Sequence, residues 1–254
     1  MGVSVVWEPE PESVSGYRTV VSMSAGNVAW DTSDVRSTPG PAPRSRREPV
    51  QERSRRRVEA VLDAAERLVV AEGVEQVTTS GIARESGVPV GSLYQYFADK
   101  EAVLLALAER HMAEMDEQTA ADLAAVPAAD LTVGVLVETS VRAFTTVYER
   151  RPAFVAIYLR GRVNPRLAAS AREHNRRIAA SLRDVAIDAG LAGPDLSLRV
   201  AELAVEVGDR VVQLAYEDDL AGDAETIAEG VHLMTAYLER YAATSTPDQE
   251  PAPS

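Results

Sequence analysis

The amino-acid sequence predicts an all-α protein with two parts, a three-helix N-terminal domain and a larger helical domain that follows it. Apolar residues recur at intervals of three and four over most of the chain, which is the spacing of one face of an α-helix. Glycine and proline interrupt this pattern where helices are expected to end, and no segment predicts a β-strand. We expect an Arg-rich, disordered extension at 1–52, helical domains at 53–100 and 101–241, and a disordered tail at 242–254.

The first two helices of the N-terminal domain have clear start and stop signals. An apolar stripe that begins at Val58 predicts a helix from about Ser54 to Glu72, and Gly73 can close it. A second helix is expected to begin at Thr78 or Thr79, because a threonine hydroxyl can accept a hydrogen bond from a free amide of the first turn.

A tight turn and a third helix follow. Gly87 can adopt the positive φ that reverses the chain after the second helix, which is expected to end near Ser86. The third helix should span about 89–96, with Leu93 and Phe97 spaced to anchor it inward. Its remaining side chains then point outward, namely Ser92, Tyr94, Gln95 and Tyr96. Hydroxyls, an amide and phenols on an exposed helix suit the major groove of DNA, so the pattern predicts a DNA-binding helix-turn-helix.

The rest of the chain predicts six helices. One should begin after a capping Asp99 and continue to about Thr119. The others are expected at 131–149, 152–162, 165–189, 195–217 and 223–241. Apolar stripes on the last two predict either intramolecular core or a dimer interface, through Val200, Leu203, Val207, Val211, Ile227, Val231, Met234 and Leu238. Gly208 lies inside the first stripe, where a mid-helix glycine indicates close packing.

The net charge of −13 is unevenly distributed along the chain. Residues 1–35 carry −4, residues 36–57 carry +6 and residues 58–254 carry −15. The basic segment therefore directly precedes the helix-turn-helix, where it is placed to bind phosphates. The acidic remainder would be repelled by DNA and could help to orient the protein on it.

Enzymatic and membrane functions find no support in the sequence. The absence of cysteine excludes disulfides and thiolate metal sites. The three histidines have no close-spaced partner, and no nucleophile elbow or phosphate-binding glycine loop is present, so we expect no metal, no cofactor and no catalysis. No run reaches the ~18 apolar residues of a membrane span, and the N-terminus lacks the layout of a secretory signal, so we expect a cytoplasmic protein.

The helix-turn-helix closely resembles that of the TetR/AcrR family of bacterial transcriptional regulators. The residues that carry the resemblance are Thr78-Thr79, Ile82-Ala83, the run Gly87-Val88-Pro89-Val90-Gly91-Ser92-Leu93-Tyr94-Gln95-Tyr96-Phe97, and Asp99-Lys100-Glu101. The match covers about residues 55–105, and beyond it only the all-helical pattern and the length agree with the family.

The resemblance implies a role for each matched position. Thr79, Tyr94, Tyr96 and Lys100 would bind phosphates, while Val90, Gly91, Ser92 and Gln95 would face base edges. Many family members have a basic residue at the position of Val90, which here either meets a thymine methyl or touches no base. We therefore expect the arginines from Arg44 to Arg57, including Arg55 and Arg56, to supply much of the affinity.

The resemblance further implies a homodimer on a palindromic double-stranded operator, released by a small molecule. Candidate residues for the effector cavity, chosen by type, are Phe144, Tyr148, Phe154, Tyr158, Arg160, His174 and Asn175. Aromatic residues at helical spacing are equally those of an ordinary core. Activation in place of repression fits the same residues. The alternative function is a helical ligand-binding or scaffolding dimer without sequence-specific DNA binding.

Overall fold

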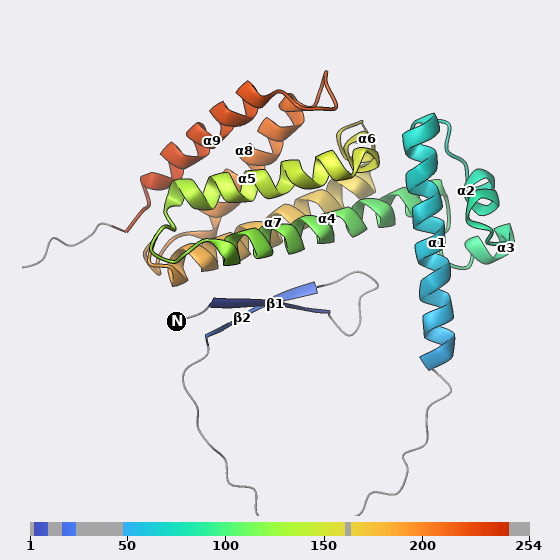
Figure 1. The fold of residues 1–254 in the computed structure, drawn as a ribbon, viewed down its shortest axis with the longest axis horizontal. Helices are drawn as coiled ribbons and strands as arrows, with labels where there is room; N and C mark the ends of the chain where they lie inside the picture. The colour runs from blue at the N-terminus through green and yellow to red at the C-terminus, as the bar shows by residue number, and fades with distance from the viewer. Residues whose placement is uncertain (1–2, 10–16, 24–47, 161–163, 244–254) are drawn as a thin grey trace, which may run out of the picture. The chain divides into compact units, whose positions relative to one another are not determined.

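The computed structural model describes residues 3–9, 17–23, 48–160 and 164–243. The chain divides into two compact units, Met1–Leu104 and Leu105–Ser254. Helices make up nearly all of the described residues from 48 onward, so the predicted all-α class is confirmed for both helical parts (Figure 1). None of the described helices is long and apolar enough to cross a membrane.

The N-terminal extension differs from the prediction of disorder over 1–52. Strands β1 (Val3–Pro9) and β2 (Tyr17–Met23) pair in an antiparallel hairpin, with Val3 opposite Met23 and Pro9 opposite Tyr17. Both strands are rich in valine, whose branched side chain favours a pleated strand. The disorder predicted here is therefore wrong for these two segments and for residues 48–52, which belong to the first helix. The remaining residues of the extension, and of the predicted tail from 244 onward, lie outside the described residues.

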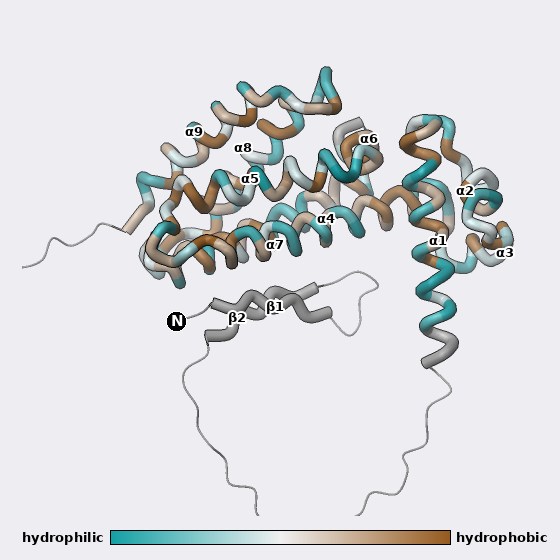
Figure 2. The backbone as a smooth tube through the Cα atoms, viewed as in Figure 1, coloured by the Kyte–Doolittle hydropathy of each residue, from teal (hydrophilic) through white to brown (hydrophobic). Residues whose placement is uncertain are grey.

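Three helices build the first helical unit. Helix α1 (Glu48–Glu72) begins six residues before its predicted start, α2 spans Thr79–Ser86, and α3 is limited to Val90–Leu93. Figure 2 shows a hydrophilic stretch in the coloured part of α1 nearest its start, followed by alternating hydrophobic and hydrophilic stretches along the helix. The hydrophobic stretches contribute the buried Val61, Leu62, Ala65 and Val69 to the core of the unit. Helix α1 packs against α2, and α2 against α3.

Six further helices follow at positions close to those predicted. Their bounds are α4 Lys100–Ala125, α5 Val133–Arg150, α6 Pro152–Arg160, α7 Pro165–Asp188, α8 Leu198–Ala215 and α9 Ala224–Glu239. Asp99 caps α4 as predicted, because its Oδ1 accepts a hydrogen bond of 2.7 Å from the amide of Ala102. Helix α4 continues six residues beyond its predicted end at Thr119.

The core of the second unit lies where α8 packs against both α7 and α9, and α9 against α5. Helices α8 and α9 approach closely at two glycines. A methyl group at Gly208 would lie 2.8 Å from the Sδ atom of Met234, and one at Gly230 would overlap Cγ1 of Val211. The close packing that Gly208 predicts is therefore present. An added methyl group would meet the flexible end of Met234 at Gly208, whereas at Gly230 it would meet the rigid, branched side chain of Val211.

Candidate nucleic-acid interface and effector cavity

Local interactions hold the helix-turn-helix in shape. Thr78 caps α2 by accepting a hydrogen bond of 3.1 Å from the amide of Gly81, which decides between the two threonines. Gly87 has φ +68°, the left-handed conformation that ends α2 and that side chains rarely adopt. Leu93 and Phe97 are buried as their spacing predicts. These two anchors fix the rotation of α3, so the opposite side of this short helix faces outward.

The regular part of α3 is shorter than the predicted 89–96. Only Val90–Leu93 is α-helical, although hydrogen-bonded turns continue to the amide of Phe97. The amides of Gln95 and Tyr96 bond to carbonyls three residues earlier, at 3.2 and 3.0 Å, which tightens the chain relative to an α-helix. The backbone thus still turns through Tyr96, and the side chains beyond Leu93 keep helix-like positions.

The outward face of α3 and the following turns carries the residues expected to meet bases. Val90 is 41% exposed and Tyr94 is 52% exposed, and both Gly91 and Gln95 are exposed. Ser92 is half-buried. Val90 on α3 and Tyr94 in the turn that follows it thus expose apolar and aromatic surface, more than packing of the unit requires. The face is therefore available for a partner.

Hydroxyl pairs connect this face to the neighbouring helices. The Tyr94 hydroxyl lies 3.1 Å from Oγ1 of Thr79 at the start of α2. The Tyr96 hydroxyl lies 3.0 Å from Oγ of Ser54 in α1. The hydrogen bond with Ser54, followed by one with Arg57, lowers the pKa of Tyr96 from its usual value. Ser54 was not among the predicted site residues, because no local spacing connects residues 42 positions apart.

Cationic side chains flank the same face. Arg55 and Arg56 are exposed on α1, and Arg56 forms an ion pair with Glu52 one turn earlier. The Nζ atom of Lys100 lies 3.4 Å from the carbonyl oxygen of Val74, so it donates to the connection between α1 and α2. Arg44 lies outside the described residues. The first helical unit thus presents hydroxyl or cationic side chains on α1, at the start of α2 and at the start of α4.

The second unit gathers most of the predicted effector residues around one small cavity. Phe144, Tyr148, Phe154, Tyr158, His174 and Asn175 all line it, and the side chain of Arg160 lies outside the described residues. Phe154 stacks in tilted fashion with Tyr148 and Tyr158, at centroid distances of 5.4 and 5.3 Å. The accessible volume is only ≈ 10 Å³, about the room that one water molecule needs. Most of this cluster is therefore packed core.

Asp209 of α8 also lines the small cavity, although it was not predicted. Its Oδ1 accepts a hydrogen bond of 2.8 Å from the Tyr158 hydroxyl, and its Oδ2 accepts one of 2.7 Å from the Gln213 amide. The sequence could have indicated Asp209, because its carboxylate lies between Val205 and Val212, on the inward side of a largely apolar helix.

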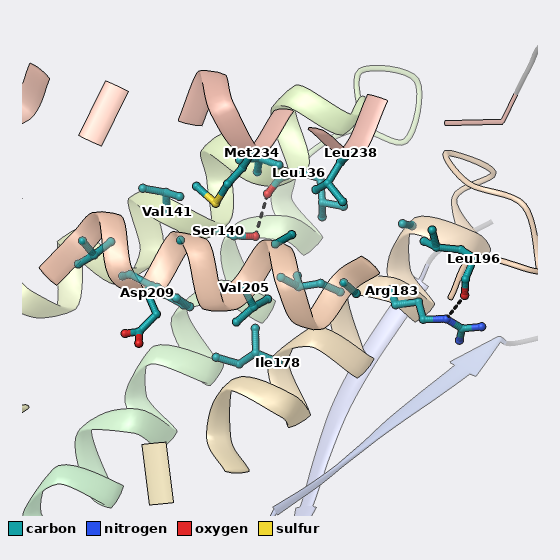
Figure 3. Close-up of a pocket in the computed structure, with 18 residues that line it drawn as sticks. Leu136, Ser140, Val141, Ile178, Arg183, Leu196, Val205, Asp209, Met234 and Leu238 are labelled. Atoms are coloured by element: carbon teal, nitrogen blue, oxygen red, sulfur yellow. Dashed lines mark hydrogen bonds between the residues drawn. The ribbon is translucent and has the colours of Figure 1, made fainter. Parts of the chain in front are cut away.

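A larger cavity lies between α5, α7, α8 and α9. Its accessible volume is ≈ 100 Å³, and its wall consists almost entirely of apolar side chains, including Leu136, Ile178, Met234 and Leu238 (Figure 3). It shares Phe144, Asp209 and Val212 with the small cavity. Residue type alone did not predict this cavity, because its wall is made of ordinary core residues from four helices.

The predicted dimer residues differ in their exposure. Val200 and Met234 are buried within one protomer, so their assignment to an interface is corrected: they belong to the core of their own chain. The seam of α9 faces α5 and α8, and Val207, Ile227, Val231 and Leu238 pack beside Met234 on the same cluster. Val211 is half-buried next to Gly230. Leu203, at 50% exposed, is the predicted residue that points clearly outward.

Two exposed leucines that were not predicted extend the outer apolar face. Leu214 on α8 is 46% exposed and Leu233 on α9 is 55% exposed. Both belong to the two helices that carry the predicted stripes, but on positions offset from them. Most residues of the predicted stripes therefore pack within their own chain, whereas Leu203, Leu214 and Leu233 remain exposed on the same two helices.

Comparison with known proteins agrees with this architecture. Residues 61–107 match the model of the tetR family of bacterial regulatory proteins, and residues 134–238 match the tetracyclin repressor-like C-terminal domain. The chain is 33% identical over 63 residues to the fatty acid metabolism regulator protein of Bacillus subtilis, a match that spans 25% of this chain and 32% of that relative.

Two longer matches cover both units. The HTH-type transcriptional regulator BetI of Rhizobium meliloti is 26% identical over 197 residues, 78% of this chain and 95% of that protein. The crystal structure of a TetR-family transcriptional regulator from Streptomyces coelicolor superposes with a TM-score of 0.59 at 27% identity, covering 74% of this chain and 98% of the other.

Regulators of this family bind DNA through the N-terminal helix-turn-helix and small-molecule effectors, typically as dimers. Both family domains lie in the expected order in this chain, with the exposed α3 face in the first and a cavity in the second. This chain belongs to the TetR family of bacterial regulatory proteins and is a DNA-binding transcriptional regulator.

Proposed function

We propose that this regulator is a homodimeric repressor that binds a palindromic operator and leaves it when a small molecule binds the second unit. The observation that carries the proposal is the outward face of α3 and the turns that follow it, where Val90, Tyr94 and Gln95 are exposed beside the buried anchor Leu93. A helix of this length reads few base pairs. Two copies related by a twofold axis would read two half-sites about one helical turn, ~34 Å, apart.

Phosphate contacts set the register of each copy on the operator. We assign them to Thr79, Tyr94, Tyr96, Lys100 and the α1 arginines Arg55 and Arg56. The hydroxyl pair of Thr79 and Tyr94 supports this assignment, since both oxygens lie at the exposed start of α2, where free amides and the helix dipole favour an anion. These contacts supply affinity that falls with salt and carries no sequence information.

Base contacts then come from Val90, Gly91, Ser92 and Gln95. Gln95 is exposed, and its amide can donate to and accept from adenine in the major groove. Val90 offers only an apolar contact, which suits a thymine methyl group. Because the operator is DNA, we place the protein in the cytoplasm. Neither binding the operator nor binding the small molecule requires it to catalyse a reaction.

Replacing Gln95 by alanine tests the assignment. Loss of a bidentate pair costs about 1–3 kcal/mol, so Gln95→Ala should weaken binding to the DNA upstream of its own gene by about 5- to 150-fold in a fluorescence-anisotropy titration. The control is Gln118→Ala, which removes an amide that donates to Asp122 on α4 and leaves the helix-turn-helix intact. Gln118→Ala should bind operator like the native protein.

Two results would count against the proposal. Equal affinity of native protein and Gln95→Ala would remove Gln95 from the base-reading set. If the native protein showed no salt-dependent binding to upstream DNA or to scanned genomic fragments, that result would favour a ligand-binding dimer whose first helical unit does not bind a DNA sequence.

A further inference from the structure

We propose that the effector of this regulator is an uncharged, largely apolar small molecule that binds in the cavity between α5, α7, α8 and α9. The inference rests on the proposed function, because it assumes that a small molecule releases the operator. It moves the effector site from the aromatic cluster around Phe154 to the larger cavity beside it.

The two cavities differ in volume. The aromatic one has ≈ 10 Å³ of accessible volume and the other ≈ 100 Å³. An apolar cavity of about 150 Å³ takes up benzene, so a cavity of this size, with small adjustments of its wall, accommodates a molecule close to a single ring. A bigger effector would have to move the helices apart.

The wall chemistry selects an apolar occupant. Leu136 and Val137 of α5, Ile178 of α7, Ala204 of α8 and Met234 of α9 present carbon and sulfur to the cavity. A charged group brought into such surroundings loses its hydration and regains little, because the wall offers few dipoles to replace water. An uncharged apolar group gains by leaving water.

The polar groups on the wall are already engaged. The Ser140 hydroxyl donates a hydrogen bond of 2.8 Å to the carbonyl oxygen of Leu136, and Nε of Arg183 donates one of 2.6 Å to the carbonyl oxygen of Leu196 (Figure 3). Arg183 also donates to Asp184. Both oxygens of Asp209 accept the hydrogen bonds from α6 and α8 described above. A carboxylate or an ammonium ligand would therefore have to share Arg183 or Asp209 with the partners that these side chains already have within the protein.

The position of the cavity also connects it to the outer face of α8 and α9. Gly208 and Met234 line the cavity and are in contact where the two helices approach. A ligand that displaces the flexible end of Met234 changes how α9 sits on α8. These are the helices whose outer sides expose Leu203 and Leu233. Occupation of the cavity would thus reach the partner protomer through the helices that form its wall.

Methionine methyl NMR separates the two cavities in one spectrum. Met234 lines the larger cavity, whereas Met112 and Met115 line the aromatic one. The full-length protein, labelled with [¹³C-methyl]methionine and assigned through Met→Leu variants, is titrated with benzene, benzoate and benzylammonium, which share one ring and differ in charge. We expect benzene to shift the Met234 signal saturably and to bind at least tenfold more tightly than either ion.

A filled cavity supplies the matched control. Ala204→Leu places a larger apolar side chain on the wall and should reduce benzene binding at least tenfold, while Ala121→Leu makes the same change at an exposed position of α4 and should leave it unaltered. The comparison of the three probes uses the native chain, so it decides the proposal even where Ala204→Leu does not fold. Benzene at saturation should lower operator affinity at least fivefold.

The results that overturn the proposal are specific. Shifts confined to Met112 and Met115 would place the ligand in the aromatic cavity, and equal or tighter binding of benzoate or benzylammonium would make the site one for ions. Saturation at Met234 with unchanged operator affinity would make it a cavity without an effector role. Operator binding by the native protein is also measured without any probe. Absence of operator binding in that measurement would contradict the proposed function and not the assignment of the cavity.

Discussion

His111 and His174 are buried ionisable residues in the second unit, 1% and 3% exposed. Burial, followed by nearby arginines, lowers the pKa of each from 6.5 to about 3, so both are neutral in the folded protein near pH 7. Nδ1 of His174 lies 3.7 Å from Oδ2 of Asp116, and burial raises the pKa of that carboxyl to about 7. The three groups therefore respond to acid in different directions.

The sign of each effect follows from the two pKa values of the group. Each of the two buried histidines has a lower pKa in the folded protein than in the unfolded chain. As the pH falls below 6.5, the unfolded chain binds a proton that the folded protein does not, and the free energy of unfolding decreases. Asp116 has a higher pKa in the fold, so its contribution increases as the pH falls from 7 towards 4. Between pH 6.5 and 5, each group changes the free energy of unfolding by about 2 kcal/mol. Two histidines outweigh one aspartate, and the native protein should lose about 2 kcal/mol.

Replacing His111 by leucine should remove one of the two acid-sensitive groups. We expect the free energy of unfolding of His111→Leu, from urea denaturation, to be nearly constant between pH 6.5 and 5. The control is His232→Leu, which alters an exposed histidine and should keep the pH dependence of the native protein. An unchanged pH dependence in His111→Leu would show that His111 does not become protonated on unfolding in this range.

At the scale of single elements, the close contact of α8 with α9 depends on glycine, which has no side chain to keep the helices apart. A methyl group at Gly230 would overlap Cγ1 of Val211 and lie 3.1 Å from its Cβ, which cannot rotate away. We expect Gly230→Ala to lower the free energy of unfolding by about 1–3 kcal/mol through overpacking. In the double variant with Val211→Ala, the methyl group gains room and most of that loss should be recovered. Urea denaturation of both single variants and the double variant measures the coupling, and simple additivity would contradict the contact.

Helix boundaries and caps were largely predictable, because they depend on local chemistry. Thr78, Gly87 and Asp99 each perform the local role that their side chain or φ allows. The start of α1 at Glu48 and the early end of α3 were not predictable from spacing. The pairing of Ser54 with Tyr96 and the cavity between four helices depend on how distant segments pack, and no periodicity in one helix contains that information.

At the scale of the whole molecule, the proposed mode of operator binding depends on a second copy. Leu203, Leu214 and Leu233 are exposed on α8 and α9 and form the apolar surface most suited to a twofold contact. A glutamate in the centre of such a contact would be buried beside its symmetry mate, which is strongly unfavourable. We expect Leu233→Glu to sediment as a monomer at micromolar concentration and to bind operator at least tenfold more weakly, with unchanged helix content by circular dichroism.

Leu220→Glu is the matched control for this prediction. Leu220 is exposed to a similar degree but lies between α8 and α9 rather than on either helix, so the variant should remain dimeric. A dimeric Leu233→Glu protein would place the interface on another surface.

The apolar stripes in the sequence predicted an interface on these two helices. The structure shows that the stripes face inward, because a helix covered on one side by its own chain has only the opposite side left for a partner.

The side-chain bond between Ser54 and Tyr96 couples two parts of the DNA-facing unit mechanically. Arg55, Arg56 and Arg57 of α1 lie within three residues of Ser54, and Gln95, the last side chain that we propose to face the bases, directly precedes Tyr96. In the proposed operator complex, the phosphate contacts of these arginines and the base contacts of Gln95 would therefore keep a fixed spacing along the duplex. Inserting one base pair between the flank held by the arginines and the core of a half-site would put the two out of phase. The protein would then have to give up one set of contacts to keep the other.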